Sequence, residues 1–143
     1  MAKSSAVPKG YSTVTTYVTA KGALGVLDFM KKAFGAKVSE KHLKDDGSLM
    51  HAEAKIGDTR IMLGEASKQW KAMPAMFYMY VADCDAVYKK ALKAGAKSVR
   101  EPADQYYGDR SGGVQDKAGN QWWFATRAKK AATKKKKSAT KSK

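Results

Sequence analysis

The sequence predicts an α+β fold made of two tandem βαβββ modules, and three observations lead to it. The chain contains an internal repeat, because TYVTAKGALGVLDFMKKAFGAK at 16–37 and MYVADCDAVYKKALKAGAKS at 79–98 both run from Tyr-Val through an amphipathic stretch to Gly-Ala-Lys. Each copy later reaches a Gly-Asp or Gly-Asn turn followed by an apolar strand, at 56–63 and 118–125. A chain of 143 residues with 43% hydrophobic residues is also long enough for one domain with a core.

The first module is predicted to open with a strand at 12–18, since STVTTYV is rich in β-branched and aromatic residues. A helix follows, because Gly35 is a suitable C-cap and stands just past apolar residues at helical spacing, namely Leu24, Leu27, Met30 and Phe34. KVSEKHL, a DDG turn and SLMHAEAKI then predict a hairpin, and TRIML at 59–63 predicts the last strand.

The second module repeats this order. The apolar run at 72–82 contains Pro74 and is about half as long as a bilayer span, so it favours a core strand over a membrane helix. Asp83 is a suitable N-cap for the next helix and Gly95 ends it, with a buried stripe of Val87, Tyr88, Ala91 and Leu92. KSVREP, SGGVQD and QWWFAT predict the three remaining strands.

The ends of the chain differ from its body. Residues 127–143 carry one arginine and eight lysines without an acidic residue, which leaves +6 of the +15 net charge on residues 1–126. A segment of Lys, Ala, Thr and Ser buries too little apolar surface to repay the entropy of ordering. We therefore expect a flexible arm at 1–10, a domain at 11–127 with modules at about 11–66 and 75–127, and a disordered lysine-rich tail at 128–143.

The sequence favours a cytoplasmic protein. The N-terminus lacks the apolar core of a signal peptide, and the single cysteine, Cys84, cannot form an internal disulfide. The tail can attract nucleic acids or other polyanions, although lysines without aromatic or arginine-rich partners make only weak, non-specific contacts. A nucleic-acid-associated protein acting through residues 128–143 is therefore one functional alternative.

A duplicated βαβββ module that ends in YYGDRSGGVQDKAGNQWWFAT, with FMKKAFGAK, MHAE and IGD in its first copy, resembles the vicinal oxygen chelate superfamily. This group comprises glyoxalases, bleomycin resistance proteins and extradiol dioxygenases, and the sequence is most similar to its PhnB-like branch. The resemblance covers about residues 11–127. It implies that the modules form a curled mixed sheet around a cavity, with the helices outside, and that modules pair within one chain or across a homodimer.

The resemblance also implies where a metal ion would be held. Catalytic members of the superfamily bind a divalent metal through His, Gln or Glu on the first and last strands of each module. The matching positions here are Thr15, Met62 or Leu63, Met76 or Phe77, and Trp123. None of these side chains is a usual ligand for a Lewis-acid metal, so we expect neither a metal nor another cofactor.

Strand alternation predicts which residues face the cavity, because successive side chains of a strand point to opposite sides. Trp123 then faces the cavity and Trp122 the helix. Arg110 lies in a loop that could reach over the cavity mouth, where it would offer a fork to a carboxylate or phosphate or would brace the loop. The expected ligand-binding residues are Thr15, Tyr17, Met62, Phe77, Met79, Tyr107, Arg110, Gln121 and Trp123.

His51 and Glu53 are the candidate catalytic residues. In SLMHAEAKI the apolar residues Met50, Ala52, Ala54 and Ile56 suit the helix-packed face, which sends Leu49, His51, Glu53 and Lys55 to the cavity face. A histidine beside a carboxylate can act as a general acid or base in a dry pocket, and it can equally orient the sheet or line a dimer interface.

The sequence thus predicts a metal-independent protein that binds a small organic molecule in the cavity and forms a homodimer. An enzyme of the same fold that uses His51 and Glu53 for proton transfer is the second alternative.

Overall fold

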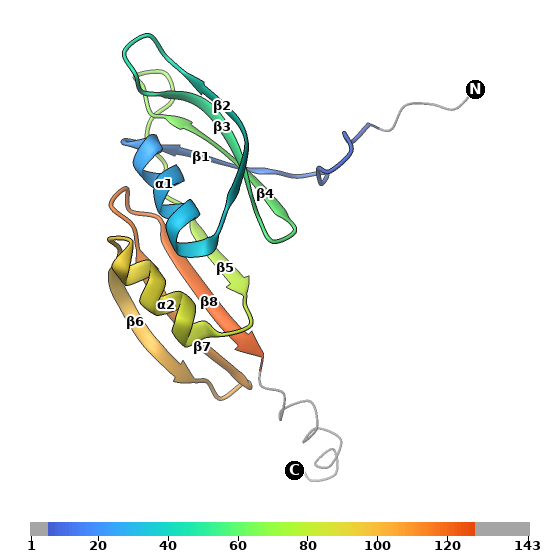
Figure 1. Cartoon of the computed structure of the whole chain (residues 1–143), viewed down its shortest axis with the longest axis vertical. Helices are drawn as coiled ribbons and strands as arrows, with labels where there is room; N and C mark the ends of the chain where they lie inside the picture. The colour runs from blue at the N-terminus through green and yellow to red at the C-terminus, as the bar shows by residue number, and fades with distance from the viewer. Residues whose placement is uncertain (1–5, 128–143) are drawn as a thin grey trace, which may run out of the picture. The chain divides into compact units, whose positions relative to one another are not determined.

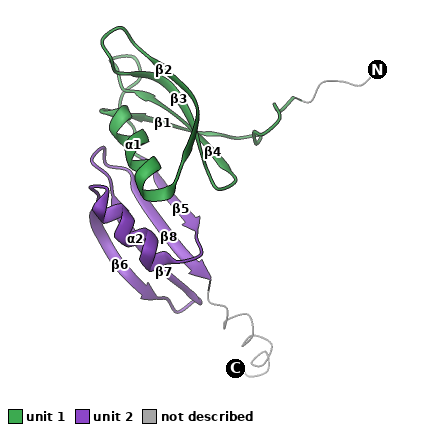
Figure 2. Cartoon of the chain, in the orientation of Figure 1, with its two compact units in different colours: residues 1–74 green, residues 75–143 purple. Residues whose placement is uncertain are grey.

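The computed structural model describes residues 6–127 (Figure 1). The chain separates into two compact units, residues 1–74 and 75–143, which we call unit 1 and unit 2 (Figure 2). Each unit has the element order βαβββ that the internal repeat predicts. The predicted tail at 128–143 and the first half of the predicted arm lie outside the described residues. Within residues 6–127, neither helix is long and apolar enough to cross a membrane.

Unit 1 is a four-stranded sheet with one helix on one of its faces. Its strand order is β1-β4-β3-β2, in which β1 and β4 are parallel and the other two pairs are antiparallel. The helix connects β1 to β2 and packs on the three strands β1, β3 and β4. The elements are β1 (Thr16–Ala20), α1 (Ala23–Phe34), β2 (Lys37–Leu43), β3 (Leu49–Ile56) and β4 (Thr59–Glu65).

The core of unit 1 lies between α1 and the sheet. Leu27 and Met30 are buried on the helix, and Val18 and Leu63 are buried on the strands. The helix ends at Gly35, whose φ of 68° is the left-handed conformation expected of a C-cap glycine. The helix and its end are therefore as the apolar spacing predicts.

The first strand is shorter than predicted. It begins at Thr16 rather than at 12, although STVTTYV has high β-propensity throughout. The physical reason is pairing, because β1 is an edge strand whose neighbour β4 pairs with it only from Ile61 onward. Tyr11, in the segment before β1, instead places its hydroxyl against Glu53 on β3.

Unit 2 repeats the architecture, with the strand order β5-β8-β7-β6. Asp83 caps its helix as predicted, since the carboxylate accepts a hydrogen bond from the Ala86 backbone N–H at 3.1 Å. Neither four-stranded sheet closes on itself, so the fold is α+β with two open mixed sheets. The elements are β5 (Met76–Tyr80), α2 (Cys84–Lys93), β6 (Lys97–Asp104), β7 (Asp109–Gln115) and β8 (Gln121–Arg127).

The turn before β8 is joined to the core of unit 2 through Asp116. Its buried carboxylate accepts hydrogen bonds from the backbone N–H groups of Ala118 and Asn120 and from the Asn120 side chain. The same carboxylate accepts the indole N–H of Trp122 at 2.8 Å. The Asp116 side chain thus satisfies hydrogen-bond donors of both the turn and Trp122, the largest buried residue of the unit.

Candidate functional site

The face of the unit 1 sheet that α1 leaves uncovered carries the candidate site, and we call it the open face of unit 1. Tyr17 of β1 pairs with Met62 of β4, and Met62 pairs with Glu53 of β3. Paired residues point to the same side of a sheet, so these three share one face. Val18 and Leu63 point to the opposite side and are buried. The orientation that alternation predicts for Tyr17, Met62 and Glu53 therefore holds.

The start of β3 departs from the predicted alternation. His42 pairs with His51, but the next residue, Leu43, pairs with Leu49, which leaves Met50 as an extra residue in β3. Such a bulge reverses the facing of the residues beyond it. Leu49 is accordingly 0% exposed and Met50 is 54% exposed. The prediction that Met50 packs on the helix and Leu49 faces the cavity is wrong for this reason.

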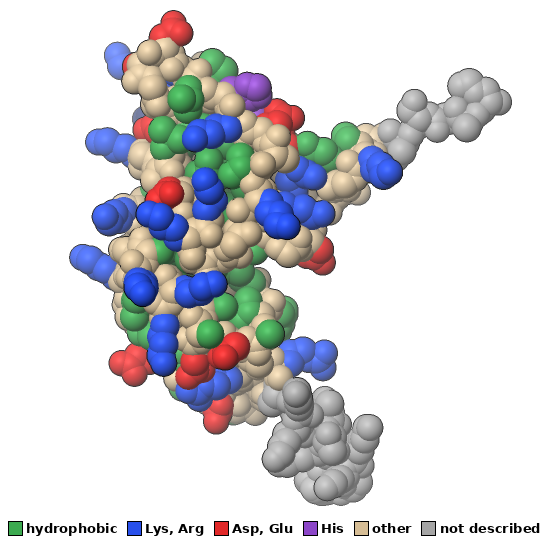
Figure 3. Space-filling model, in the orientation of Figure 1, with side chains coloured by type: hydrophobic (Ala, Val, Ile, Leu, Met, Phe, Trp, Pro, Cys, Tyr) green, Lys and Arg blue, Asp and Glu red, His purple; other side chains and the backbone are tan. Residues whose placement is uncertain are grey.

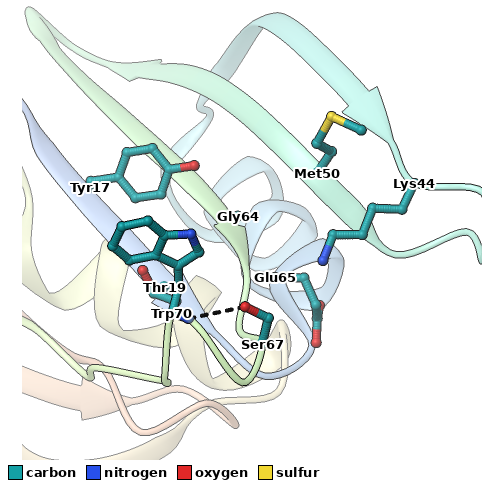
Figure 4. A pocket seen from close by; sticks show the side chains of 8 residues that line it. All are labelled: Tyr17, Thr19, Lys44, Met50, Gly64, Glu65, Ser67 and Trp70. Atoms are coloured by element: carbon teal, nitrogen blue, oxygen red, sulfur yellow. Dashed lines mark hydrogen bonds between the residues drawn. The ribbon is translucent and has the colours of Figure 1, made fainter.

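A pocket of about 530 Å³ lies on the open face, at the end of β4 (Figure 4). Tyr17 and Trp70 stand on one side of it, and Met50 and Lys44 stand on the other (Figure 4). It therefore combines two aromatic rings, a thioether and a primary amine. The lining residues are Tyr17, Thr19, Lys44, Met50, Gly64, Glu65, Ser67 and Trp70.

Trp70 reaches the pocket from the segment between β4 and β5. The turn that presents it is closed by two hydrogen bonds, from the Ser67 backbone N–H to the Trp70 carbonyl at 2.8 Å and from the Trp70 backbone N–H to Ser67 Oγ at 3.0 Å. The sequence patterns do not predict Trp70 as part of a site. The available signal was a tryptophan standing alone among polar residues in SKQWK, outside any predicted strand or helix.

The two charged residues of the pocket differ in what they leave for a ligand. Both carboxylate oxygens of Glu65 accept backbone N–H groups at the start of α1, from Gly22 at 2.9 Å and Ala23 at 3.0 Å. These bonds occupy one acceptor site on each oxygen, and the positive end of the helix dipole offsets part of the negative charge. Lys44 forms no ion pair among the described residues, and its amine extends into the pocket (Figure 4).

Gly64 makes room for the tyrosine at the back of the pocket. A Cβ at this position would lie 2.9 Å from the Tyr17 hydroxyl and 2.9 Å from the Met50 carbonyl oxygen. No ordinary side chain fits there without displacing one of the two groups. The glycine thus allows the Tyr17 hydroxyl to lie low over β4, beside His51.

A chain of hydrogen bonds runs along the open face behind the pocket, and we call it the relay (Tyr17, His51, Glu53 and Tyr11). The Tyr17 hydroxyl lies 3.1 Å from His51 Nδ1, and His51 Nε2 lies 3.0 Å from Glu53 Oε2. The other carboxylate oxygen of Glu53 accepts the hydroxyl hydrogen of Tyr11. The structure therefore brings the predicted pair His51 and Glu53 together and joins it to Tyr17.

The surroundings of Glu53 keep its carboxylate ionised. Hydrogen bonds from His51 and Tyr11 hold the pKa of Glu53 below its usual range, and Arg60, 4.0 Å away, acts in the same direction. The hydrogen bond that Tyr11 donates to Glu53 raises the pKa of the Tyr11 phenol, which stays protonated as a donor. Arg60 is itself fixed, since its guanidinium stacks over the Tyr11 ring at 4.3 Å and donates to Ser39 Oγ at 2.8 Å.

The positions that the resemblance implies for metal ligands do not fit a divalent ion. They hold a hydroxyl, thioethers, apolar side chains and an indole, which are poor donors for such an ion: Thr15, Met62, Leu63, Met76, Phe77 and Trp123. Thr15 lies one residue before β1 and is half-buried.

One cluster within residues 6–127 does have donor atoms close enough for a metal. One ligand atom each of Glu40, His51 and Glu53 lies within 4.8 Å of the others. His51 and Glu53 already bind one another, however, and Arg60 lies against the same carboxylate. A cation would have to replace the imidazole hydrogen and compete with a guanidinium, which weighs against a metal at this cluster.

In unit 2 the register corrects two predicted ligand-binding residues. Phe77 pairs with Trp122 and Met79 pairs with Phe124, so all four point to the side covered by α2. Phe77 stacks on the Trp122 ring with centroids 4.2 Å apart. The assignment of Phe77 and Met79 to the cavity face is therefore wrong.

The other side of unit 2, which we call the open face of unit 2, carries the second tryptophan. Trp123 lies between Gly113, where a Cβ would come within 2.5 Å of its ring, and the guanidinium of Arg100 at 4.8 Å. Its indole N–H donates to Gln121 Oε1 at 2.9 Å. Trp123 and Gln121 are on the predicted face, and alternation also places Trp122 correctly in the core. The exposed strand residues Met76, Tyr78 and Tyr80 share this face.

Arg110 does not stand over a cavity mouth. Its guanidinium forms a two-pronged pair with Asp85 on α2, with Nε to Oδ1 at 2.7 Å and Nη2 to Oδ2 at 2.9 Å, and it also binds Asp104 at 3.2 Å. The expectation of an anion fork is corrected, since Arg110 braces β7 to the helix.

Tyr107 lies on the open face of unit 2, with its hydroxyl 3.4 Å from that of Tyr78. Partial desolvation of the hydroxyl and this contact raise the pKa of Tyr78 to about 12.

The charge on the surface is spread out. On the face in view, Lys and Arg side chains are interspersed with Asp and Glu over the described residues and form no single basic patch (Figure 3). The lysine-rich segment that would recruit a polyanion, residues 128–143, lies outside the described residues.

Comparisons with known proteins agree with this architecture. The family model of the Glyoxalase/Bleomycin resistance protein/Dioxygenase superfamily matches residues 25–124. Mb0911c of Mycobacterium bovis is 32% identical over 120 residues, covering 76% of this chain and 79% of that protein. Rv0887c of Mycobacterium tuberculosis is 32% identical over 120 residues and is covered over 71% of its length.

Solved structures share the fold at lower identity. TioX from Micromonospora sp. ML1 matches with a TM-score of 0.69 and 20% identity, covering 81% of this chain and 98% of TioX. A PhnB protein from Bacillus cereus matches with a TM-score of 0.66 and 17% identity, covering 80% and 99%. These likenesses show a shared fold with PhnB-like structural relatives, and the match to the family model shows that the chain belongs to the Glyoxalase/Bleomycin resistance protein/Dioxygenase superfamily.

Proposed function

We propose that this protein binds a small organic anion with a flat apolar body in the pocket of unit 1, without a resident metal ion. The observation that carries the proposal is the pocket itself, which has aromatic walls at one side and an amine at the other. Its volume of about 530 Å³ is in the range of small-molecule sites. The rings of Tyr17 and Trp70 offer stacking surfaces for a planar ligand.

The charges favour an anion over a cation. Glu65 accepts two backbone N–H groups at the positive end of α1, which lowers its attraction for a positive ligand. Lys44 is the cation of the pocket and forms no ion pair among the described residues. An anionic group would therefore point at Lys44 while the flat body lies between Met50 and the aromatic rings. Metal independence rests on the poor fit of both candidate ligand sets to a divalent ion.

The test uses 4-nitrobenzoate and its neutral isostere 4-nitrobenzamide, with binding measured by isothermal titration calorimetry. We expect the wild type to bind the carboxylate about fivefold more tightly, as befits one partly exposed charge pair. Lys44→Met should remove this preference, and Trp70→Ala should weaken both ligands at least tenfold. Trp70 supplies an aromatic wall.

Matched controls decide which unit binds. Lys37→Met removes an exposed lysine outside the pocket, and Trp123→Ala removes the tryptophan of the open face of unit 2. Both should keep the wild-type affinity and the preference for the carboxylate. The proposal is wrong if Trp70→Ala binds like the wild type, or if only Trp123→Ala loses binding.

A homodimer is part of the same proposal. Edge strand β5 presents Met76, Tyr78 and Tyr80 as exposed apolar side chains on one face, and such a row gains free energy when a partner covers it. Sedimentation equilibrium of the intact chain should return twice the chain mass at micromolar concentration, and a monomer mass would contradict this part of the proposal.

A further inference from the structure

We propose that Tyr17 is the proton-transfer group of the unit 1 pocket and that His51 is the base behind it, so that the protein moves a proton on its bound ligand. This inference rests on the proposed binding function and names the chemistry that the same pocket would perform. It concerns Tyr17, which is a member of the relay and also lines the pocket.

Tyr17 connects the pocket to the imidazole, because its side chain lines the pocket and its hydroxyl contacts His51. Tyr17 is the member of the relay that lines the pocket, and the other three members are joined to it in sequence by hydrogen bonds. Its hydroxyl is 3.1 Å from His51 Nδ1, which is within reach for proton transfer. Gly64 holds this arrangement open, because a Cβ there would collide with the hydroxyl.

The carboxylate sets the tautomer of His51. Glu53 is 6% exposed and ionised, so it accepts a hydrogen bond and the hydrogen must be on His51 Nε2. Nδ1 of the neutral imidazole then carries a lone pair, and it accepts the hydroxyl hydrogen of Tyr17. An imidazolium formed at His51 would be stabilised by the same carboxylate. The order of groups parallels a serine–histidine–carboxylate triad, with a phenol in the place of the serine and the two ring nitrogens exchanged.

The step is a proton abstraction from an acidic C–H bond of a flat conjugated ligand, such as a carbon next to a carbonyl. The Tyr17 oxygen takes the proton from carbon while its own hydrogen passes to His51 Nδ1. The electron pair of the C–H bond moves into the conjugated system of the ligand, where Lys44 stabilises the negative charge that develops. Return of the proton to another atom of the ligand completes an isomerisation, and its delivery to a leaving group as the bond to that group breaks completes an elimination. Either outcome restores Tyr17 and neutral His51 and needs no oxidant.

The probe is 5-nitrobenzisoxazole, a flat molecule that opens to a coloured phenolate when a base removes the hydrogen from C3 and the N–O bond breaks. We expect saturable ring opening by the wild type and a loss of at least tenfold in kcat/KM in Tyr17→Phe and in His51→Asn, in keeping with the usual contribution of acid–base catalysis, about 10² to 10⁴. Binding is measured separately with 5-nitrobenzotriazole, which has the same shape and cannot open, and should change less than threefold in both variants.

Two matched controls accompany the variants. His42→Asn removes the other histidine of the chain, which is exposed and bound to Glu40 outside the pocket, and Tyr80→Phe removes an exposed hydroxyl of unit 2. Both should retain wild-type ring opening. Tyr17→Phe deletes a single oxygen and decides the question alone if circular dichroism shows that His51→Asn has lost the fold.

The outcomes separate the two proposals. If the wild type does not bind 5-nitrobenzotriazole, the binding function fails and this inference fails with it. If the analogue binds but 5-nitrobenzisoxazole does not open, the relay is refuted and the binding function survives. The relay is equally refuted if Tyr17→Phe opens the probe as fast as the wild type, or if His42→Asn loses as much activity as His51→Asn.

Discussion

Gly64→Ala tests the packing that places Tyr17 beside His51. The added Cβ would lie 2.9 Å from the Tyr17 hydroxyl and 2.9 Å from the Met50 carbonyl oxygen. Unstrained contacts with carbon need about 3.5 Å, so each oxygen must move by roughly 0.6 Å. The Met50 carbonyl belongs to the backbone of the β3 bulge, whereas Tyr17 can turn about its side-chain bonds. We therefore expect the tyrosine to move and to lose its hydrogen bond to His51.

The expected cost is about 1–3 kcal/mol for overpacking, of which about 1 kcal/mol is the lost hydrogen bond. Phenylalanine at position 17 has no oxygen to collide with the new methyl group. In the Tyr17→Phe background, Gly64→Ala should therefore be less destabilising by about 1 kcal/mol, while the contact with Met50 still contributes.

Urea unfolding of the wild type, both single variants and the double variant, followed by circular dichroism, measures this coupling. Gly25→Ala is the matched control, since the same methyl group on the exposed side of α1 meets nothing within 4 Å and should stabilise by about 0.5–1 kcal/mol. If the changes in the free energy of unfolding caused by Gly64→Ala and Tyr17→Phe add to within about 0.3 kcal/mol in the double variant, the Tyr17 hydroxyl does not obstruct the new methyl group. The packing described for Tyr17 and Gly64 would then be wrong.

Three further predictions follow from the contacts. Asp116→Ala should destabilise unit 2 by about 3 kcal/mol in urea unfolding, because it leaves the buried Trp122 indole N–H and turn N–H groups unsatisfied, and an effect under 1 kcal/mol would contradict this. Hydrogen bonds depress the pKa of Glu53 in the folded state, so the contribution of its carboxylate to the free energy of unfolding is complete above the unfolded pKa of about 4.3 and is lost as the pH falls further. Glu53→Gln should therefore reduce the loss of stability at acid pH, which urea unfolding at a series of pH values would measure. Purified protein should carry no stoichiometric transition metal by elemental analysis, and one bound ion per chain abolished by His51→Asn would refute metal independence.

Local sequence patterns were enough to predict the architecture. The repeat, the βαβββ order and the helix ends at Asp83 and Gly35 depend on residues close in sequence, whose spacing and backbone preferences act without help from the rest of the chain. Alternation likewise sorted Trp122 from Trp123, because β8 carries a run of residues paired on both sides without a bulge. The pair His51 and Glu53 was found in the same way, since both lie beyond the irregular start of β3.

Only the tertiary structure decided which residues meet in the pocket. The alternation of apolar and polar residues gives no sign of the extra residue in β3, so the exchange of faces between Met50 and Leu49 cannot be read from the sequence. Strand β5 is apolar on both sides, and only its pairing with β8 shows that Phe77 stacks on Trp122 while Tyr78 is on the open face. Trp70 comes from a connecting segment with no periodicity at all. The sequence by itself determined the modules and the likeness to the superfamily, whereas the contacts of Tyr17 with His51 and of Tyr11 with Glu53 join residues 34 and 42 positions apart, which no local pattern encodes.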